Sequence, residues 1–223
     1  MNSLVAQWLK TSWRPLLVIT LALLLRLVYN LCFFEHRICH AGDSYYYLTA
    51  GKALARLVCT SPDWAHFWAQ LWQKTSVLPG SFQSFSSTNL TDRLLLDGPV
   101  FPSYLGFLFL LLGQKGSELA LNVNSTFFAA ANSLVDSGSC LLLYFVTAEA
   151  FGVGAGLTAG LLLAFYGPAI INTQQCYSEP FAYFLLLAWC FTFTRLVLHP
   201  PGALRAAAYL VFGLLTGLVM LSK

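Results

Sequence analysis

The stretch that decides the fold runs from Pro15 to Phe34, PLLVITLALLLRLVYNLCFF. It is about 20 residues long and almost wholly apolar, which suffices for a helix to cross the ~30 Å hydrocarbon core of a bilayer. Lys10 and Arg14 precede it and no acidic residue does, so the positive-inside rule places the N-terminus in the cytoplasm. Because no small-residue cleavage site follows a short apolar region, we interpret the stretch as a signal anchor and first span.

The composition of the chain is that of an integral membrane protein. Hydrophobic residues make up 57% of it, charged residues only 9%, and the mean hydropathy is +0.67; a soluble globular chain is usually about 25% charged. Aromatic residues reach 15%, which fits aromatic belts at the bilayer interfaces. The net charge of +3 is small and scattered, so we expect no nucleic-acid partner.

Four later apolar runs are also long enough to cross the membrane: 119–147, 153–172, 180–198 and 205–222. The run from Tyr104 to Leu112 is too short to cross, and Pro99 and Pro102 precede it. We therefore interpret it as an interfacial or re-entrant helix on the outer side. The spans then alternate so that Arg195 and Arg205 fall in a cytoplasmic loop with His199, as the positive-inside rule requires.

The segment between the first two spans contains one clear helix start, Ser61-Pro62-Asp63. Ser61 suits the N-cap, proline the first helical position and aspartate the positive end of the helix dipole. The residues that follow repeat apolar side chains at helical spacing, which predicts an amphipathic helix in the headgroup region; a packed helix of a soluble loop domain is the alternative. The apolar positions are Trp64, Trp68, Leu71 and Trp72.

Together these patterns predict an all-α, polytopic transmembrane protein with about five spans and a long outer loop that carries juxtamembrane amphipathic helices. Its parts are a cytoplasmic N-terminus and first span (1–34), the outer loop (35–118) and four further spans (119–223). A bacterial inner membrane or the endoplasmic reticulum would both suit it. Cys39 and Cys59 lie in the outer loop, where a disulfide is possible in an oxidising compartment.

Two charged residues fall inside predicted spans, Arg26 and Asp136. Each is costly in hydrocarbon unless it is paired or faces a cavity. A rise of ~1.5 Å per residue places both at a similar depth from the cytoplasmic ends, so we predict a structural ion pair between the first two spans. Small and polar residues near Asp136 are typical of helix–helix packing: Asn132, Ser133, Ser137, Gly138 and Ser139.

Three acidic residues are candidates for chemistry, and each has a structural alternative. Asp43, before a run of tyrosines, could act as a general base or cap a helix. Asp97 could equally be a cap or turn residue, and Glu179 suits the dipole at the start of a span. The predicted topology gathers all three on the outer face, together with Lys223.

With these positions in place, the chain resembles the polytopic, lipid-linked-sugar glycosyltransferases of the C superfamily, in particular the dolichyl-phosphate-mannose protein mannosyltransferases and the aminoarabinose transferase of lipid A. The order of features matches: a span, an outer loop with an early aspartate, juxtamembrane helices, then several spans. The similar motifs are Gly42-Asp43-Ser44-Tyr45-Tyr46, Leu96-Asp97-Gly98-Pro99, Ser178-Glu179-Pro180-Phe181 and Leu221-Ser222-Lys223.

The resemblance implies an inverting transfer of a sugar from a polyprenyl or dolichyl phosphate to a protein or glycolipid acceptor on the periplasmic or lumenal face. It assigns Asp43 the role of catalytic base or acceptor-positioning carboxylate and Lys223 a contact with the lipid phosphate. Asp97, Glu179 and Tyr46 would bind the acceptor, the sugar or a divalent cation.

Several features depart from the family pattern. No second acid follows Asp43, and Glu179 stands where the family has aspartate. Family members also carry more spans, so the chain is similar to the N-terminal portion of such an enzyme. A transporter fragment and a non-catalytic membrane scaffold are the alternatives; against a transporter, we identify no pair of discontinuous helices, and the charges gather at one face instead of the midplane where carriers bind substrate.

Overall fold

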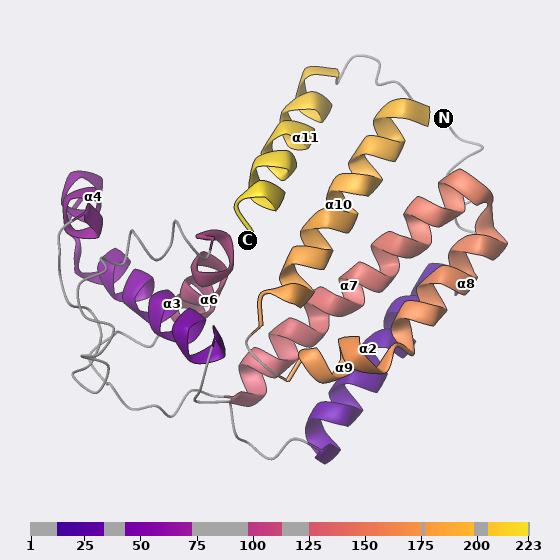
Figure 1. Ribbon diagram of the computed structural model, residues 1–223, viewed down its shortest axis with the longest axis horizontal. Helices are drawn as coiled ribbons and strands as arrows, with labels where there is room; N and C mark the ends of the chain where they lie inside the picture. Colours follow the sequence, from indigo (N-terminus) through magenta and orange to yellow (C-terminus); the bar gives the residue numbers. More distant parts are fainter. Residues whose placement is uncertain are drawn as a thin grey trace.

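A computed structural model describes residues 13–33, 43–72, 98–112, 125–174, 177–198 and 205–222. Every regular element in these ranges is a helix, which confirms the all-α class (Figure 1). The helices are α2 (Trp13–Phe33), α3 (Asp43–Thr60), α4 (Trp64–Trp72), α6 (Val100–Leu111), α7 (Ser125–Phe151), α8 (Val153–Ala164), α9 (Gly167–Asn172), α10 (Glu179–Leu198) and α11 (Arg205–Met220).

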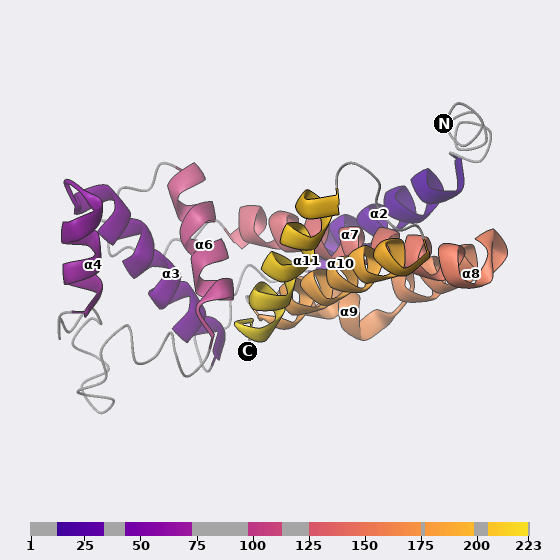
Figure 2. The ribbon, with the colours of Figure 1, turned by 90° about the horizontal axis from the view of Figure 1, so that it is seen from above.

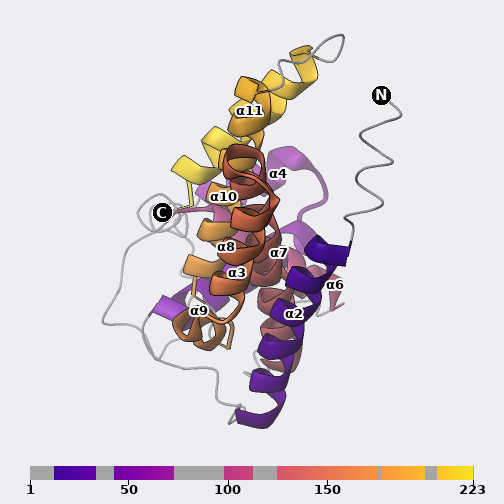
Figure 3. The ribbon, with the colours of Figure 1, turned by 90° about the vertical axis from the view of Figure 1, so that its right-hand side faces the viewer.

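The helices form two groups. In the bundle, α2, α7, α8, α10 and α11 alternate in direction, so that the end of α2, the starts of α7 and α10 and the ends of α8 and α11 lie towards one end of it (Figure 1). Figure 3 shows α2 alongside α7 and α8, against which it packs. The second group, the side arm of α3, α4 and α6, lies beside that same end of the bundle (Figures 1 and 2).

Three of the described helices are long and apolar enough to cross a membrane: α2, α7 and α10. Helix α11 is apolar but has 16 residues, and α8 has 12; about 20 are needed for a full crossing. The structure thus supports a membrane protein with at least three candidate spans where the sequence predicts five. Helix α6 also has 12 residues, which agrees with the prediction that this run is too short to cross.

The predicted span 153–172 is not one continuous helix. It consists of α8 and the six-residue α9, which are separated at Phe165 and Tyr166. The physical reason is Pro168, because a proline has no N–H to donate to the carbonyl four residues earlier and its ring clashes there. Tyr166 leaves the helical region, with φ −70° and ψ 103°, and α9 turns across the end of the bundle (Figure 1).

Glycines set the hairpin between α7 and α8. Gly152, the residue that separates the two helices, has φ 93°, a left-handed conformation that favours glycine. A Cβ at Gly156 would lie 2.6 Å from both the Tyr144 carbonyl oxygen and the Ala148 Cβ. Only a residue without a side chain lets α8 lie this close to α7. Helix α7 begins and ends slightly later than the predicted run 119–147.

The segment predicted to be the outer loop contains α3 in addition to the amphipathic helix predicted after Ser61. Helix α4 begins at Trp64, so its N-cap is Asp63 and not Ser61. The Asp63 Oδ1 accepts the His66 backbone N–H at 2.8 Å, and the His66 ring Nδ1 lies 3.0 Å from the same oxygen. These two hydrogen bonds from His66, the backbone one foremost, lower the pKa of Asp63 from its ordinary value of 3.8.

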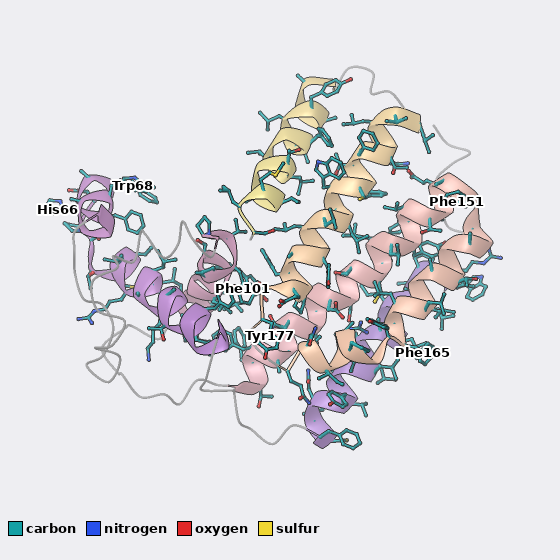
Figure 4. All side chains as sticks on the ribbon, viewed as in Figure 1. His66, Trp68, Phe101, Phe151, Phe165 and Tyr177 are labelled. Atoms are coloured by element: carbon teal, nitrogen blue, oxygen red, sulfur yellow. The ribbon has the colours of Figure 1, made fainter. Side chains whose placement is uncertain are left out.

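Helix α4 presents two tryptophans outward and is attached to α3 by Phe67. Trp64 and Trp68 are 72% and 51% exposed, whereas Phe67 packs against the cluster around Ala50 of α3. Figure 4 shows Trp68 and His66 on opposite sides of the helix. This arrangement is the amphipathic one that the sequence predicts, with an aromatic side that suits a headgroup region.

Candidate functional site

The side arm meets the bundle through several aromatic rings, including Phe109 of α6 against Phe128 of α7. We name four of the rings the junction cluster: Tyr47, Phe101, Tyr104 and Phe181. Tyr47 of α3 makes an edge contact with Phe101 of α6, with ring centroids 5.2 Å apart. Phe181 of α10 stacks on Tyr104 at 4.6 Å and lies 6.1 Å from Phe101. All four residues belong to the first two turns of their helices, so the starts of α3, α6 and α10 converge here.

Two glycines position α3 against α6. A Cβ at Gly51 would lie 2.8 Å from the Leu105 Cβ and 3.0 Å from both the Gly106 nitrogen and the Pro102 carbonyl oxygen. A Cβ at Gly106 would in turn lie 3.0 Å from the Gly51 carbonyl oxygen. The two backbones therefore touch at this crossing, as in the small-residue interfaces of membrane helices, and this register sets Tyr47 opposite Phe101.

The predicted catalytic residue Asp43 is the first residue of α3, and Tyr46 lies in the same first turn. The helix begins at Asp43 itself, whereas an N-cap lies one residue before the first helical residue, so the capping alternative stays a prediction. The backbone of both residues is described and their side chains are not. Asp43 lies one helical turn before Tyr47 of the junction cluster, so the structure brings the start of α3 to this cluster.

Glu179 is the first residue of α10 and lies two positions before Phe181. Its side chain is half-buried, and its Oε2 is buried with no hydrogen-bond partner among the described residues. A buried carboxylate oxygen without a donor carries a desolvation cost, which a ligand with a hydroxyl or N–H group would relieve.

Asp97 and Lys223 both lie outside the described residues. The first described residue after Asp97 is Gly98, which lies shortly before α6 and has a φ of 82°, a left-handed conformation that favours glycine. The last described residue before Lys223 is Ser222, which is buried. The end of α11 lies beside α6 in two perpendicular views (Figures 1 and 2). Figure 4 shows Phe101 between the side arm and the bundle, where these helix ends meet.

The predicted divalent cation has no complete set of ligands in the described part of the chain, where no group of three or more His, Cys, Asp or Glu side chains could hold a metal ion. Cys39 lies outside the described residues, and Cys59 is exposed near the end of α3. The cation and the disulfide both stay predictions.

A second polar centre lies inside the bundle, and it confirms the predicted Arg26–Asp136 ion pair. The Arg26 guanidinium is 0% exposed, and Asp136 is 2% exposed. The Arg26 Nε donates to the Asp136 Oδ2 at 2.5 Å, and Nη1 donates to the Ala22 carbonyl oxygen at 3.0 Å. A buried charge pair inside a span is stable only with good geometry and satisfied hydrogen bonds, and both are present.

Arg26 has further partners that were not predicted from the sequence. Arg26 also donates to the carbonyl oxygens of Leu163 and Ala164 at the end of α8, at 3.5 and 3.3 Å. The missed signal was Gly167-Pro168 inside an apolar run, a pattern that ends or kinks a helix. This one discontinuous segment weakens the case made from sequence against a transporter.

Asn30 extends the polar centre one turn along α2. Its Nδ2 donates to Ser133 Oγ at 2.8 Å and to Thr173 Oγ1 at 3.3 Å, and all three side chains are buried. The spacing of four from Arg26 could have predicted this, because residues four apart share a helix face. Gly138 behaves as predicted for helix packing: a Cβ there would lie 2.9 Å from the Phe184 ring of α10.

Comparison with known proteins finds no matching family model, no similar curated protein and no similar solved structure.

Proposed function

We propose that the protein is a membrane glycosyltransferase that transfers a sugar from a polyprenyl or dolichyl phosphate to an acceptor on the outer side of the membrane. The observation that carries the proposal is the convergence of the starts of α3, α6 and α10 at the junction cluster. Asp43 and Glu179 belong to two of these starts, and Asp97 lies shortly before the third.

The proposed membrane topology has five spans: α2, α7, the broken segment α8–α9, α10 and α11. The bundle end next to the side arm faces the periplasm or lumen, and the other end, with the N-terminus, faces the cytoplasm. Arg195 near the end of α10 forms an ion pair with Glu149 of α7 at 2.7 Å. A positive residue at that end agrees with the positive-inside rule.

In the proposed mechanism, Asp43 orients or deprotonates the acceptor hydroxyl, whose oxygen attacks the anomeric carbon of the donor sugar. The bond from that carbon to the phosphate oxygen breaks, and the leaving phosphate needs no strong acid because it is stable as an anion. Lys223 stabilises its charge. Glu179, Asp97 and Tyr46 hold the acceptor or the sugar, and the buried Oε2 of Glu179 supports such a role because it lacks a donor in the described chain.

The decisive experiment compares Asp43→Asn with the parent in a transfer assay with prenyl-phosphate sugars in proteoliposomes. A general base contributes about 10²- to 10⁴-fold, so we expect a loss of turnover in that range with donor binding retained. Asp63→Asn is the matched control, because Asp63 caps α4 away from the junction cluster. Unchanged turnover in Asp43→Asn would remove the catalytic assignment, and a parent without transfer from any such donor would remove the proposed function.

A transporter is the second candidate, and one observation favours it. A discontinuous helix with a buried charge pair at its break is a feature of carriers, and α8–α9 with Arg26 and Asp136 has this form. The two functions differ in their response to Asp43→Asn. A carrier that uses the break would keep its flux in that variant, whereas a transferase would lose turnover.

A further inference from the structure

Helix α8 ends inside the bundle with a backbone carbonyl that the helix itself cannot satisfy. In an α-helix, the carbonyl oxygen of one residue accepts the N–H of the residue four positions later. For Ala164 this partner is residue 168, a proline, which has no N–H. Ala164 is 0% exposed, so its carbonyl needs a donor from elsewhere in the bundle.

Arg26 supplies that donor. Its Nη1 donates to the Ala164 carbonyl oxygen at 3.3 Å, and its Nη2 donates to that of Leu163 at 3.5 Å. The positive guanidinium also lies at the carboxyl end of α8, where the helix dipole is negative. Arginine can serve Asp136, Ala22 and these two carbonyls at once, because its planar fork carries five N–H groups.

Asn30 holds the other side of the same break. It lies one turn after Arg26 on α2, and its Nδ2 reaches Thr173 at the end of α9 at 3.3 Å. Arg26 therefore contacts the last residues before the break, and Asn30 contacts the first residue after α9. Helix α10 begins at Glu179, six residues after Thr173, so the direction of α9 also constrains where the start of α10 lies.

We propose that Arg26 is a positioning residue that holds the break between α8 and α9 in place of the backbone donor that Pro168 removes. Asp136 keeps the guanidinium charge neutralised and oriented, and Asn30 fixes the far side of the break. Arg26 has this role whether the protein is a transferase or a carrier. The alternative is an ion pair that only neutralises two buried charges.

The two explanations predict different effects of Pro168→Ala on stability in the absence of Arg26. Arg26→Leu with Asp136→Leu removes both charges together but leaves the Ala164 carbonyl without a donor. An unsatisfied buried acceptor lowers the ratio of folded to unfolded protein by about tenfold. Adding Pro168→Ala to that double variant restores most of the loss, because the alanine amide donates to the Ala164 carbonyl and continues the helix. In the parent, Pro168→Ala restores nothing, because Arg26 already serves that carbonyl.

The assay is reversible unfolding by SDS in mixed micelles. The proposal is overturned if Pro168→Ala has the same effect in the parent and in the double variant. Arg195→Leu is the control for charge removal, because its ion pair with Glu149 is partly exposed, and we expect a small change there. If the double variant does not fold, Arg26→Lys decides: it keeps the charge beside Asp136 but cannot reach the separate carbonyls. We expect a measurable loss from it, and an unchanged midpoint would overturn the proposal.

A second readout reports the geometry of the break directly. Leu162 before the break and Ile171 after it are both exposed, so each accepts a spin label. Nine residues of continuous helix span ~13.5 Å. We expect the distance between the labels to move towards this value in the triple variant and to keep its parent value in Pro168→Ala alone. An equal shift in the two would mean that proline alone sets the break and that Arg26 does not hold it.

Discussion

Replacement of Phe181 by alanine tests the junction cluster, one of the contacts that join the side arm to the bundle. Phe181 is half-buried and stacks on Tyr104 with centroids 4.6 Å apart and ring planes 24° apart. Truncation of a fully buried phenylalanine costs about 3–5 kcal/mol, so a half-buried one costs about half of that. The aromatic pair adds about 0.5–1.5 kcal/mol. We therefore expect Phe181→Ala to lower the free energy of unfolding by about 2–4 kcal/mol.

Tyr183 provides the matched control, because it lies on the same helix two positions later and is 56% exposed. Tyr183→Ala is expected to stay within about 0.5 kcal/mol of the parent. Phe181→Leu, which keeps apolar volume but loses the ring contact, should fall between the two. The measurement is SDS unfolding in mixed micelles, followed by tryptophan fluorescence. If Phe181→Ala and Tyr183→Ala unfold at the same SDS concentration, the junction cluster does not hold the side arm to the bundle.

Two further predictions concern the side arm. Gly51→Val should destabilise the protein by about 1–3 kcal/mol, because the first added carbon already lies 2.8 Å from the Leu105 Cβ; Gly154→Val, with open space around its Cβ position, is the control in the same unfolding assay. The stability that the Asp63 cap gives to α4 should depend on pH, because hydrogen bonds from His66 lower the pKa of Asp63. The cap is fully stabilising above ~pH 3.8, the ordinary pKa of an aspartate. Its stabilising effect disappears as the pH falls through the lowered pKa of Asp63. The measurement is the chemical shift of the His66 backbone amide, followed by NMR across an acid titration. A midpoint at or above 3.8 would contradict the hydrogen bond from this amide to Asp63.

Apolar runs and charge placement predicted much of the bundle from sequence. The first span, the helix at 180–198 and the helix at 205–222 were predicted to within a few residues, because long apolar segments leave few alternatives to a membrane helix. The ion pair of Arg26 with Asp136 followed from the cost of isolated charges in hydrocarbon. Both predictions use large free-energy terms that can be assessed one segment at a time: the transfer of an apolar helix into the bilayer, and the cost of an isolated charge there.

What sequence could not predict depends on long-range packing. The convergence of α3, α6 and α10 needs the glycine crossing at Gly51 and Gly106, and single glycines in apolar runs have many uses. The break at Pro168 had a visible signal, but its stabilisation by Arg26 depends on a contact across 138 positions of the chain. Of the candidate site residues, only Glu179 is described with its side chain. The predicted roles of all five stay predictions: Asp43, Tyr46, Asp97, Glu179 and Lys223.

The position of Arg26 has a consequence for the order in which the chain enters the membrane. Helix α2 emerges from the ribosome before α7 and α8, and its arginine then has neither Asp136 of α7 nor the carbonyls of α8 available. Insertion of an unpaired arginine at the centre of a span costs about 2.5–3.5 kcal/mol. The leucine-rich remainder of α2 offsets that cost until the α7–α8 hairpin arrives. We therefore expect α2 alone to be a weak membrane anchor, and α2, α7 and α8 to become stable in the bilayer only together.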